Sequence, residues 1–322
     1  MVLCGANWKI LPAAFLLWMP LIVAGQMLPN SHKQSVQDGD ACVTLLEQSE
    51  KAIHAQNFSA AIQESQQALH HCQNQTDALL LVARAQMLSK QFDPAVDSLQ
   101  KLLASDPQNV AALMLLGQVQ YLNSHDGEAE GAFHQAIAAA PEKPEPHYYL
   151  GRMEYEDGRI PEAMEQFNAA IKLDSSFYKA YDNLGLSYEA QGNNALALQN
   201  YMKALELVYK DHPEYDSVYL NLAEFMLKQG DNQKAFDAAA EASSRNPRNP
   251  KSFFLAGKAL EQAGHEEESL RWLKKAAQMD PAYPDPHYIL ARIYRKQGQM
   301  REANEEAAIF KILLDKAPKV KR

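Results

Sequence analysis

The sequence lacks most of the signals that mark an enzyme or a nucleic-acid-binding protein. It has only 3 cysteines and 3 tryptophans in 322 residues, and its net charge is −9. A negative net charge argues against a protein that holds nucleic acid through overall positive charge. The chain has no Walker loop and no GxSxG, HExxH, GxGxxG or paired CxxC motif. We therefore expect no catalytic activity, no cofactor and no nucleic-acid partner.

Long hydrophobic runs are also scarce, and the one present lies near the amino terminus. Residues 10–25 form an apolar run of 16 residues that contains Pro12 and Pro20. This is short for a membrane span, which needs about 20 residues. Val23 and Gly25 are small enough for a signal-peptidase site. The pattern predicts a secretory signal peptide over residues 1–25, with an uncleaved membrane anchor as the alternative. Residues 26–40 are polar and are expected to form a linker.

The chain is rich in internal repetition. An alanine recurs with a period of 34 residues, with one step of 38 and with serine in its place once. These markers are Ala61, Ala95, Ala129, Ala163, Ala197, Ala235, Ser269 and Ala303. The longer step reflects four additional residues around KDHPEY, at positions 210–215. They either lengthen a helix or form a loop.

Each repeat contains a second small residue, 12 positions before the marker. If the marker is position 20 of a repeat, this residue is position 8. Two helices approach closely only where neither presents a bulky side chain, so positions 8 and 20 are expected to face each other. Position 8 is Ser49, Ala83, Gly117, Gly151, Gly185, Ala223, Gly257 and Ala291. Glycines between the two halves predict a tight turn, at Gly127, Gly158, Gly192, Gly230, Gly264 and Gly298.

This pattern resembles the tetratricopeptide repeat family. The segments YDNLGLSYEAQGNNALALQNYMKALEL and HYYLGRMEYEDGRIPEAMEQFNAAIKL carry the resemblance most clearly, and it extends over residues 41–315. It implies an all-α, right-handed superhelical solenoid of about eight helix-turn-helix repeats, followed by a basic tail at 316–322. The expected repeats lie near 42–75, 76–109, 110–143, 144–177, 178–215, 216–249, 250–283 and 284–315.

The resemblance also implies a function. In this family the first helices line a concave groove that binds an extended peptide or a helix of a partner protein. We therefore expect a non-catalytic scaffold that is exported, either secreted or periplasmic, and the periplasmic choice rests on family analogy alone. Asn183 and Asn221 match asparagines that hold a bound peptide's backbone in other members.

The groove residues follow from the packing stripe of the first helix. Positions 4, 7, 8 and 11 pack, so positions 2, 5, 9 and 12 form the neighbouring stripe. With the two asparagines, the candidates are Arg84, Gln118, Tyr121, Tyr148, Arg152, Tyr155, Lys258, Tyr288, Arg292 and Arg295. Position 9 carries four cations, which predicts a partner that is acidic or ends in a carboxylate.

Two alternatives to this groove remain open. The cations at position 9 could instead make ordinary surface pairs with nearby carboxylates, which contribute only about 0–1 kcal/mol each. The groove could also bind a glycan or cell-wall fragment, with Tyr121, Tyr148 and Tyr155 as stacking platforms.

The cysteines and histidines complete the list of candidates. Cys42 and Cys72 begin the first helix and end the second helix of repeat 1, and an antiparallel pair brings these ends together. We expect a disulfide, with buried free thiols as the alternative. His70 and His71 adjoin Cys72, but neighbouring residues on a helix point in different directions, so we expect no metal site.

Overall fold

The computed structural model describes residues 33–212 and 214–316, and the expected signal segment 1–25 lies outside them. In this part of the chain there are sixteen α-helices and no strands. None of the described helices is long and apolar enough to cross a membrane. The helices form two compact units that divide between Leu173 and Asp174. Each unit is described separately below.

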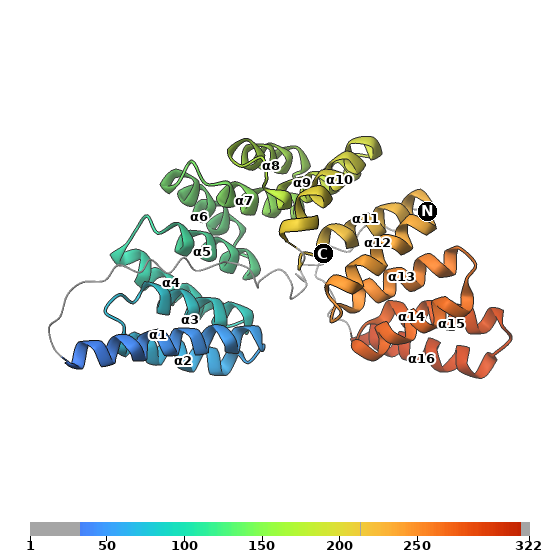
Figure 1. Ribbon diagram of the computed structural model, residues 1–322, viewed down its shortest axis with the longest axis horizontal. Coiled ribbons are helices and arrows are strands. Elements are labelled where there is room, and N and C mark those ends of the chain that lie inside the picture. The colour runs from blue at the N-terminus through green and yellow to red at the C-terminus, as the bar shows by residue number, and fades with distance from the viewer. Residues whose placement is uncertain (1–32, 213, 317–322) are drawn as a thin grey trace. The chain divides into compact units, whose positions relative to one another are not determined.

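The first unit contains four helix pairs that follow one another in chain order (Figure 1). They are α1 (Lys33–His54) and α2 (Phe58–His71), α3 (Thr76–Leu88) and α4 (Phe92–Ser105), α5 (Val110–Leu122) and α6 (Asp126–Ala139), and α7 (Pro144–Glu156) and α8 (Ile160–Leu173).

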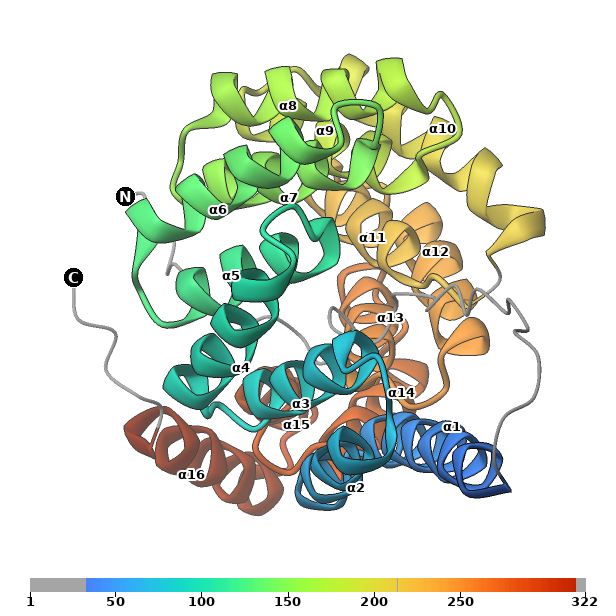
Figure 2. The ribbon, with the colours of Figure 1, turned by 90° about the vertical axis from the view of Figure 1, so that its left-hand side faces the viewer.

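The second unit repeats this arrangement with four further pairs, of which α11 and α12 lie side by side in both views (Figures 1 and 2). They are α9 (Tyr178–Ala190) and α10 (Asn194–Asp211), α11 (Ser217–Gln229) and α12 (Asn232–Arg245), α13 (Pro250–Gln262) and α14 (Glu266–Met279), and α15 (Pro284–Lys296) and α16 (Met300–Lys316). The expectation of an all-α solenoid of eight repeats is confirmed.

The helix contacts place the first helices of neighbouring repeats against one another. In the first unit α1 contacts α3, α3 contacts α5, and α5 contacts α7. In the second unit the same chain of contacts runs from α9 through α11 and α13 to α15. Each unit therefore has one face built from first helices, which we call the first-helix face.

The helix bounds correct three sequence expectations, two about the ends of the solenoid and one about a turn. Helix α1 begins at Lys33, so residues 33–40 are helical rather than part of a linker. Helix α16 ends at Lys316, so this residue of the expected tail is helical, while residues 317–322 lie outside the described part. Gly127 lies inside α6 and does not mark a turn. The four-residue insertion lengthens a helix: α10 has 18 residues, whereas α8 and α12 have 14.

The turn inside each repeat uses a left-handed residue at position 15. Five of these residues are glycines with φ of 75–86°, as in Gly158 and Gly264. The other three are Gln56, Lys90 and Ser124, with φ of 59–63°. A side chain at positive φ crowds the following carbonyl, so this position favours glycine.

The close approach between the two helices of a repeat is visible at position 8. A Cβ atom on Gly185 would lie 2.5 Å from the ring of Tyr201, and one on Gly117 would lie 2.6 Å from the ring of Phe133. Both rings belong to position 24, one turn after the marker alanine. Positions 8 and 20 also meet directly, because the Ser269 hydroxyl donates a hydrogen bond of 2.7 Å to the Gly257 carbonyl. The expected facing of positions 8 and 20 is confirmed.

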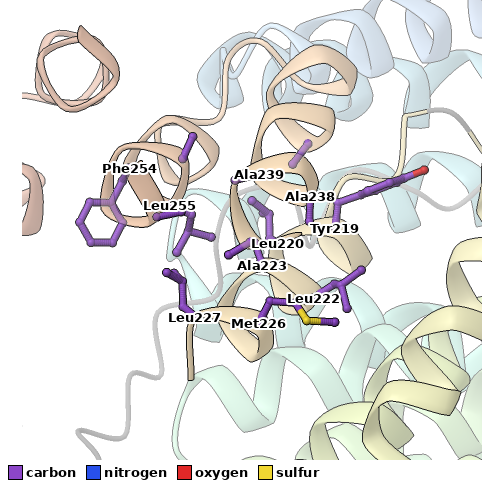
Figure 3. Packing of buried hydrophobic residues seen from close by; sticks show 14 of the residues in the cluster. Tyr219, Leu220, Leu222, Ala223, Met226, Leu227, Ala238, Ala239, Phe254 and Leu255 are labelled. Carbon is purple, nitrogen blue, oxygen red and sulfur yellow. The ribbon is translucent and has the colours of Figure 1, made fainter. Parts of the chain in front are cut away.

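The core of the second unit is continuous from repeat to repeat. Leu220, Ala223 and Leu227 of α11 lie on the side that faces Leu255 of α13, near Ala239 of α12 (Figure 3). All five side chains are buried. Each helix pair thus covers the apolar face of the next pair, which is why a single repeat could not fold alone.

Candidate functional site: the first-helix face

All twelve candidate residues lie on first helices. In the first unit they occupy α3, α5 and α7, and in the second unit they occupy α9, α11, α13 and α15. Because these helices contact one another within each unit, the candidates of one unit belong to one face. Their exposure and their contacts differ greatly.

In the first unit two cations influence the same buried tyrosine hydroxyl. Burial raises the pKa of the Tyr149 hydroxyl, whereas the nearby guanidinium groups of Arg152 and Arg84 act in the opposite direction. Burial lowers the pKa of Arg84, and the carboxylate of Glu50 on α1 counteracts this effect. Arginine keeps its charge in proteins, so the charges of Arg84 on α3 and Arg152 on α7 both act on the Tyr149 hydroxyl.

The candidates on α5 and α7 also make contacts within their own helices. Nη2 of Arg152 donates to Oε1 of Glu156 at 3.0 Å, and the Arg152 side chain is only 12% exposed. On α5, Nε2 of Gln118 donates to the backbone carbonyl of Met114 at 3.2 Å. Tyr155, one helical turn beyond Arg152, is half-buried.

Two expected stacking platforms are not available on this face. Tyr121 and Tyr148 are each only 6% exposed. The Tyr148 ring packs against Tyr149 and Phe167, with centroids 5.3 and 6.2 Å away. The Tyr121 hydroxyl lies 3.4 Å from Oδ1 of Asp157, the residue that follows α7. These rings are covered by protein, so the interpretation of Tyr121 and Tyr148 as sugar platforms is wrong.

A buried carboxyl lies beside Tyr155 in the sequence. Glu154 is 4% exposed, and Nη1 of Arg159 lies 3.7 Å from its Oε1. Burial raises the Glu154 pKa to about 7, the Arg159 charge opposes this, and the carboxylates of Glu130 and Glu162 add to it. Arg159 also pairs with Glu130, whose Oε1 accepts a hydrogen bond from Nη1 at 3.2 Å.

In the second unit the segment after α10 reaches the first-helix face. The Tyr215 hydroxyl donates to Oδ2 of Asp182 at 2.9 Å, and Nδ2 of Asn221 donates to Oδ1 of Asp182 at 2.9 Å. Asp182 is only 1% exposed. Nδ2 of Asn183, which is 7% exposed, donates to the Lys179 carbonyl at 2.9 Å. The side-chain amides of both expected peptide-holding asparagines are therefore engaged within the chain.

The last two repeats present the most exposed candidates. Tyr288 is 51% exposed, with the Arg292 guanidinium 5.8 Å from its ring centroid. Arg292 also pairs with Glu261 of α13. Arg295 is exposed one turn further along α15, and Lys258 of α13 is half-buried. This end of the face is basic and accessible.

Sequence reasoning missed two residues of this face. Tyr149 occupies position 6 of its repeat. Asn183 and Asn221 occupy the same position, and only those two residues were candidates there. Tyr215 lies in the insertion, and the repeat pattern assigns no place to its side chain. A search of position 6 in every repeat would have found Tyr149, but nothing in the sequence places Tyr215 against Asp182.

The expected disulfide and the expected absence of a metal site can both be compared with the structure. Cys42 and Cys72 are joined in the structure, with Cα atoms 5.0 Å apart. In the described part of the chain no group of three histidine, cysteine, aspartate or glutamate side chains could hold a metal ion.

Comparison with known proteins identifies the repeats. Family models described as "Tetratricopeptide repeat" match residues 52–121, 176–248 and 227–285, and one described as "TPR repeat" matches 151–192. Together they cover well over half of the chain. Among curated proteins, none matches this sequence.

Solved structures share the fold. A chain of the APC/C hetero-tetramer Cut9–Hcn1 is 15% identical with a TM-score of 0.60, covering 85% of this chain and 55% of that one. PilW, a type IV pilus biogenesis factor, is 20% identical with a TM-score of 0.56, covering 68% and 100%. PilF of Pseudomonas aeruginosa is 19% identical with a TM-score of 0.54, covering 67% and 97%.

Proposed function

The chain belongs to the tetratricopeptide repeat family, and we propose that it is a non-catalytic scaffold that binds an extended peptide or a helix of a partner protein on its first-helix face. Proteins of this family bind protein partners. The observation that carries the proposal is the contact of first helix with first helix within each unit. It brings polar and aromatic side chains from successive repeats onto one surface, which suits a ligand that runs across several repeats.

The chemistry of the partner follows from the accessible end of this face. Arg152 is mostly buried beside Glu156, so it offers little to an incoming charge. Arg295 is exposed and Lys258 is half-buried, and the exposed Tyr288 of α15 offers a rigid ring. We place the acidic or carboxylate-terminated part of the partner on α13 and α15. Burial of two of its three tyrosines argues against the glycan alternative, because a buried ring offers no face for a sugar to stack on.

Export belongs to the same proposal. It is supported by the apolar run at residues 10–25 and by the two cysteines, since disulfides persist mainly in oxidising compartments. The expected site is the periplasm or the outside of the cell, where the scaffold would meet its partner. Amino-terminal sequencing of the protein recovered from cells tests this directly, because a secreted chain begins after Gly25 and an anchored chain does not.

Site-specific photocrosslinking in the source cells tests which face binds. A photoreactive phenylalanine replaces Tyr155 or Arg295 on first helices, and in control chains it replaces Gln135 or Lys275, which are exposed on the second helices α6 and α14. We expect crosslinked partner from the first pair of positions only. Crosslinks of equal yield from the second helices would refute binding on the first-helix face.

A charge experiment tests the preference for an acidic partner. The variant Lys258→Glu with Arg295→Glu is compared with Lys101→Glu with Lys275→Glu, which changes net charge equally on second helices. We expect crosslinking from a photoreactive phenylalanine at Tyr288, which lies in the same unit as the changed residues, to fall in the first variant and to persist in the second. A similar yield from both would reject the acidic preference while leaving the scaffold function intact.

A further inference from the structure

At two outward positions the last helix differs from the second helix of every other repeat. Positions 26 and 29 lie on the solvent side of each second helix, and in α16 they are Ile309 and Ile312, which are 39% and 52% exposed. In the other seven repeats these two positions are polar or alanine. They are Gln67, Lys101, Gln135, Ala169, Lys203, Glu241 and Lys275 at position 26, and His70, Ala104, Ala138, Lys172, Glu206, Ser244 and Gln278 at position 29. Two exposed isoleucines one helical turn apart form a contiguous apolar surface, the kind that a contact with another chain can cover.

The two isoleucines belong to a longer stripe, which we call the α16 stripe: Glu305, Ile309, Ile312 and Lys316. The spacing of 4, 3 and 4 residues places all four on one side of an α-helix. All four are exposed. Along the helix the stripe reads acid, isoleucine, isoleucine, base.

This order is self-complementary when a second copy runs antiparallel. Ile309 of one copy then lies opposite Ile312 of the other, and Glu305 of one copy lies opposite Lys316 of the other. The same contacts occur twice about a two-fold axis, as in an isologous dimer. Glu305 pairs with Arg301 within the helix at 3.2 Å, but such an exposed pair contributes only about 0–1 kcal/mol and can be exchanged.

We propose that the α16 stripe is a self-association surface, through which two copies of this chain pair by antiparallel α16 helices. The stripe lies on a second helix, so the pairing leaves the first-helix face free and does not depend on the function proposed for that face. A contact of two helices buries less than the area of a standard stable interface, so the dimer should form and dissociate with concentration.

Sedimentation velocity over a range of concentrations tests the proposal on the chain purified with its own amino terminus, in one nonionic detergent throughout. We expect reversible dimers. The variant Ile309→Ser with Ile312→Ser should raise the dissociation constant by about 10-fold or more, because it removes the apolar centre. The matched control Lys275→Ser with Gln278→Ser introduces serine at the same two positions of repeat 7, where no apolar side chain is lost, and should leave the dissociation constant unchanged.

Charge exchange tests the antiparallel register. Glu305→Lys alone and Lys316→Glu alone should each raise the dissociation constant by about 5-fold, because like charges then face each other. The double variant should return to within about 2-fold of the original chain, since the pair is restored in reverse. A monomer at all concentrations overturns the proposal. A dimer insensitive to the isoleucine variants, or a double variant that is not restored, overturns it as well.

Discussion

Nδ1 of His287 lies 2.6 Å from Oε2 of Glu306, and this contact joins the first helix of the last repeat to its second. The equivalent His147 of repeat 4 lies 2.7 Å from Oε1 of Gln166. In both repeats the histidine is position 4 and its partner is position 23. His287 is buried and His147 is half-buried, and each has one ring nitrogen in contact with the second helix of its repeat.

This equivalence predicts which substitutions at Glu306 are tolerated. Glu306→Gln should change the free energy of unfolding by less than about 1 kcal/mol, because glutamine makes the same contact in repeat 4. Glu306→Leu should cost about 1–3 kcal/mol, since the His287 ring nitrogen loses its partner in a buried site. Urea denaturation at neutral pH measures both, with the exposed Asn304→Leu as the control. Equal losses for the glutamine and leucine variants would contradict the prediction.

The contact between Gly185 and Tyr201 predicts a clear cost for a single methyl group. Gly185→Ala places a Cβ atom 2.5 Å from a ring that is fully buried, so we expect a loss of about 1–3 kcal/mol in the free energy of unfolding. Gly131 also lies inside a helix, but nothing lies within 4 Å of its would-be Cβ. Gly131→Ala should therefore stabilise by up to about 1 kcal/mol. Denaturant titrations should therefore show a lower free energy of unfolding for Gly185→Ala and a higher one for Gly131→Ala.

The left-handed turn position offers a stabilising change. Lys90 has φ of 62° at a position that is glycine in five other repeats. Lys90→Gly should raise the free energy of unfolding by about 0.5–1 kcal/mol, because relief of the steric clash exceeds the added entropy of the unfolded chain. The reverse change, Gly192→Ala, should cost about 1 kcal/mol. Thermal unfolding followed by circular dichroism measures both, and a destabilised Lys90→Gly chain would contradict this account of the turn.

Glu154 predicts a pH dependence of stability. Burial raises its pKa from about 4.5 to about 7 in the folded chain, against the opposing charge of Arg159. Between these values the folded state binds more protons than the unfolded state, so the contribution of this group to stability falls as pH rises. Glu154→Gln cannot lose a proton, and it should gain stability relative to the original chain across this window.

Urea denaturation from about pH 3.5 to about pH 8 (about one unit on each side of this window) measures the difference between the two chains. Glu142→Gln, in the exposed turn before α7, serves as the control and should show the same pH dependence as the original chain. A constant difference between Glu154→Gln and the original chain would show that Glu154 does not titrate in this range.

The joined cysteines predict a dependence of repeat 1 on oxidation. Closing a loop with a sequence separation of 30 should stabilise by about 3–4 kcal/mol in the chain-entropy model. We expect Cys42 and Cys72 to react with iodoacetamide only after reduction and unfolding, as read by mass spectrometry of the intact chain. Alkylation of both without reductant, in denaturant, would refute the disulfide in the purified protein.

Much of the fold followed from the sequence because the repeat is local. The spacing of Ala129 and Ala163 set the period, and small residues at position 8 indicated where helices approach. The number and order of helices depend on such short-range patterns, and the same pattern occurs in every repeat. The pattern also placed Arg295 and Tyr288 on an accessible face, although it gave no measure of their exposure.

Tertiary packing decided the features that depend on neighbours. Tyr148 and Arg295 belong to the same stripe of the repeat, yet Tyr148 is buried against Phe167 and Arg295 is exposed. A helical position fixes the direction of a side chain, but its burial depends on what the adjoining helices place in front of it. For the same reason only the structure could bring Tyr215 to Asp182, since their contact crosses from an insertion that has no counterpart in other repeats.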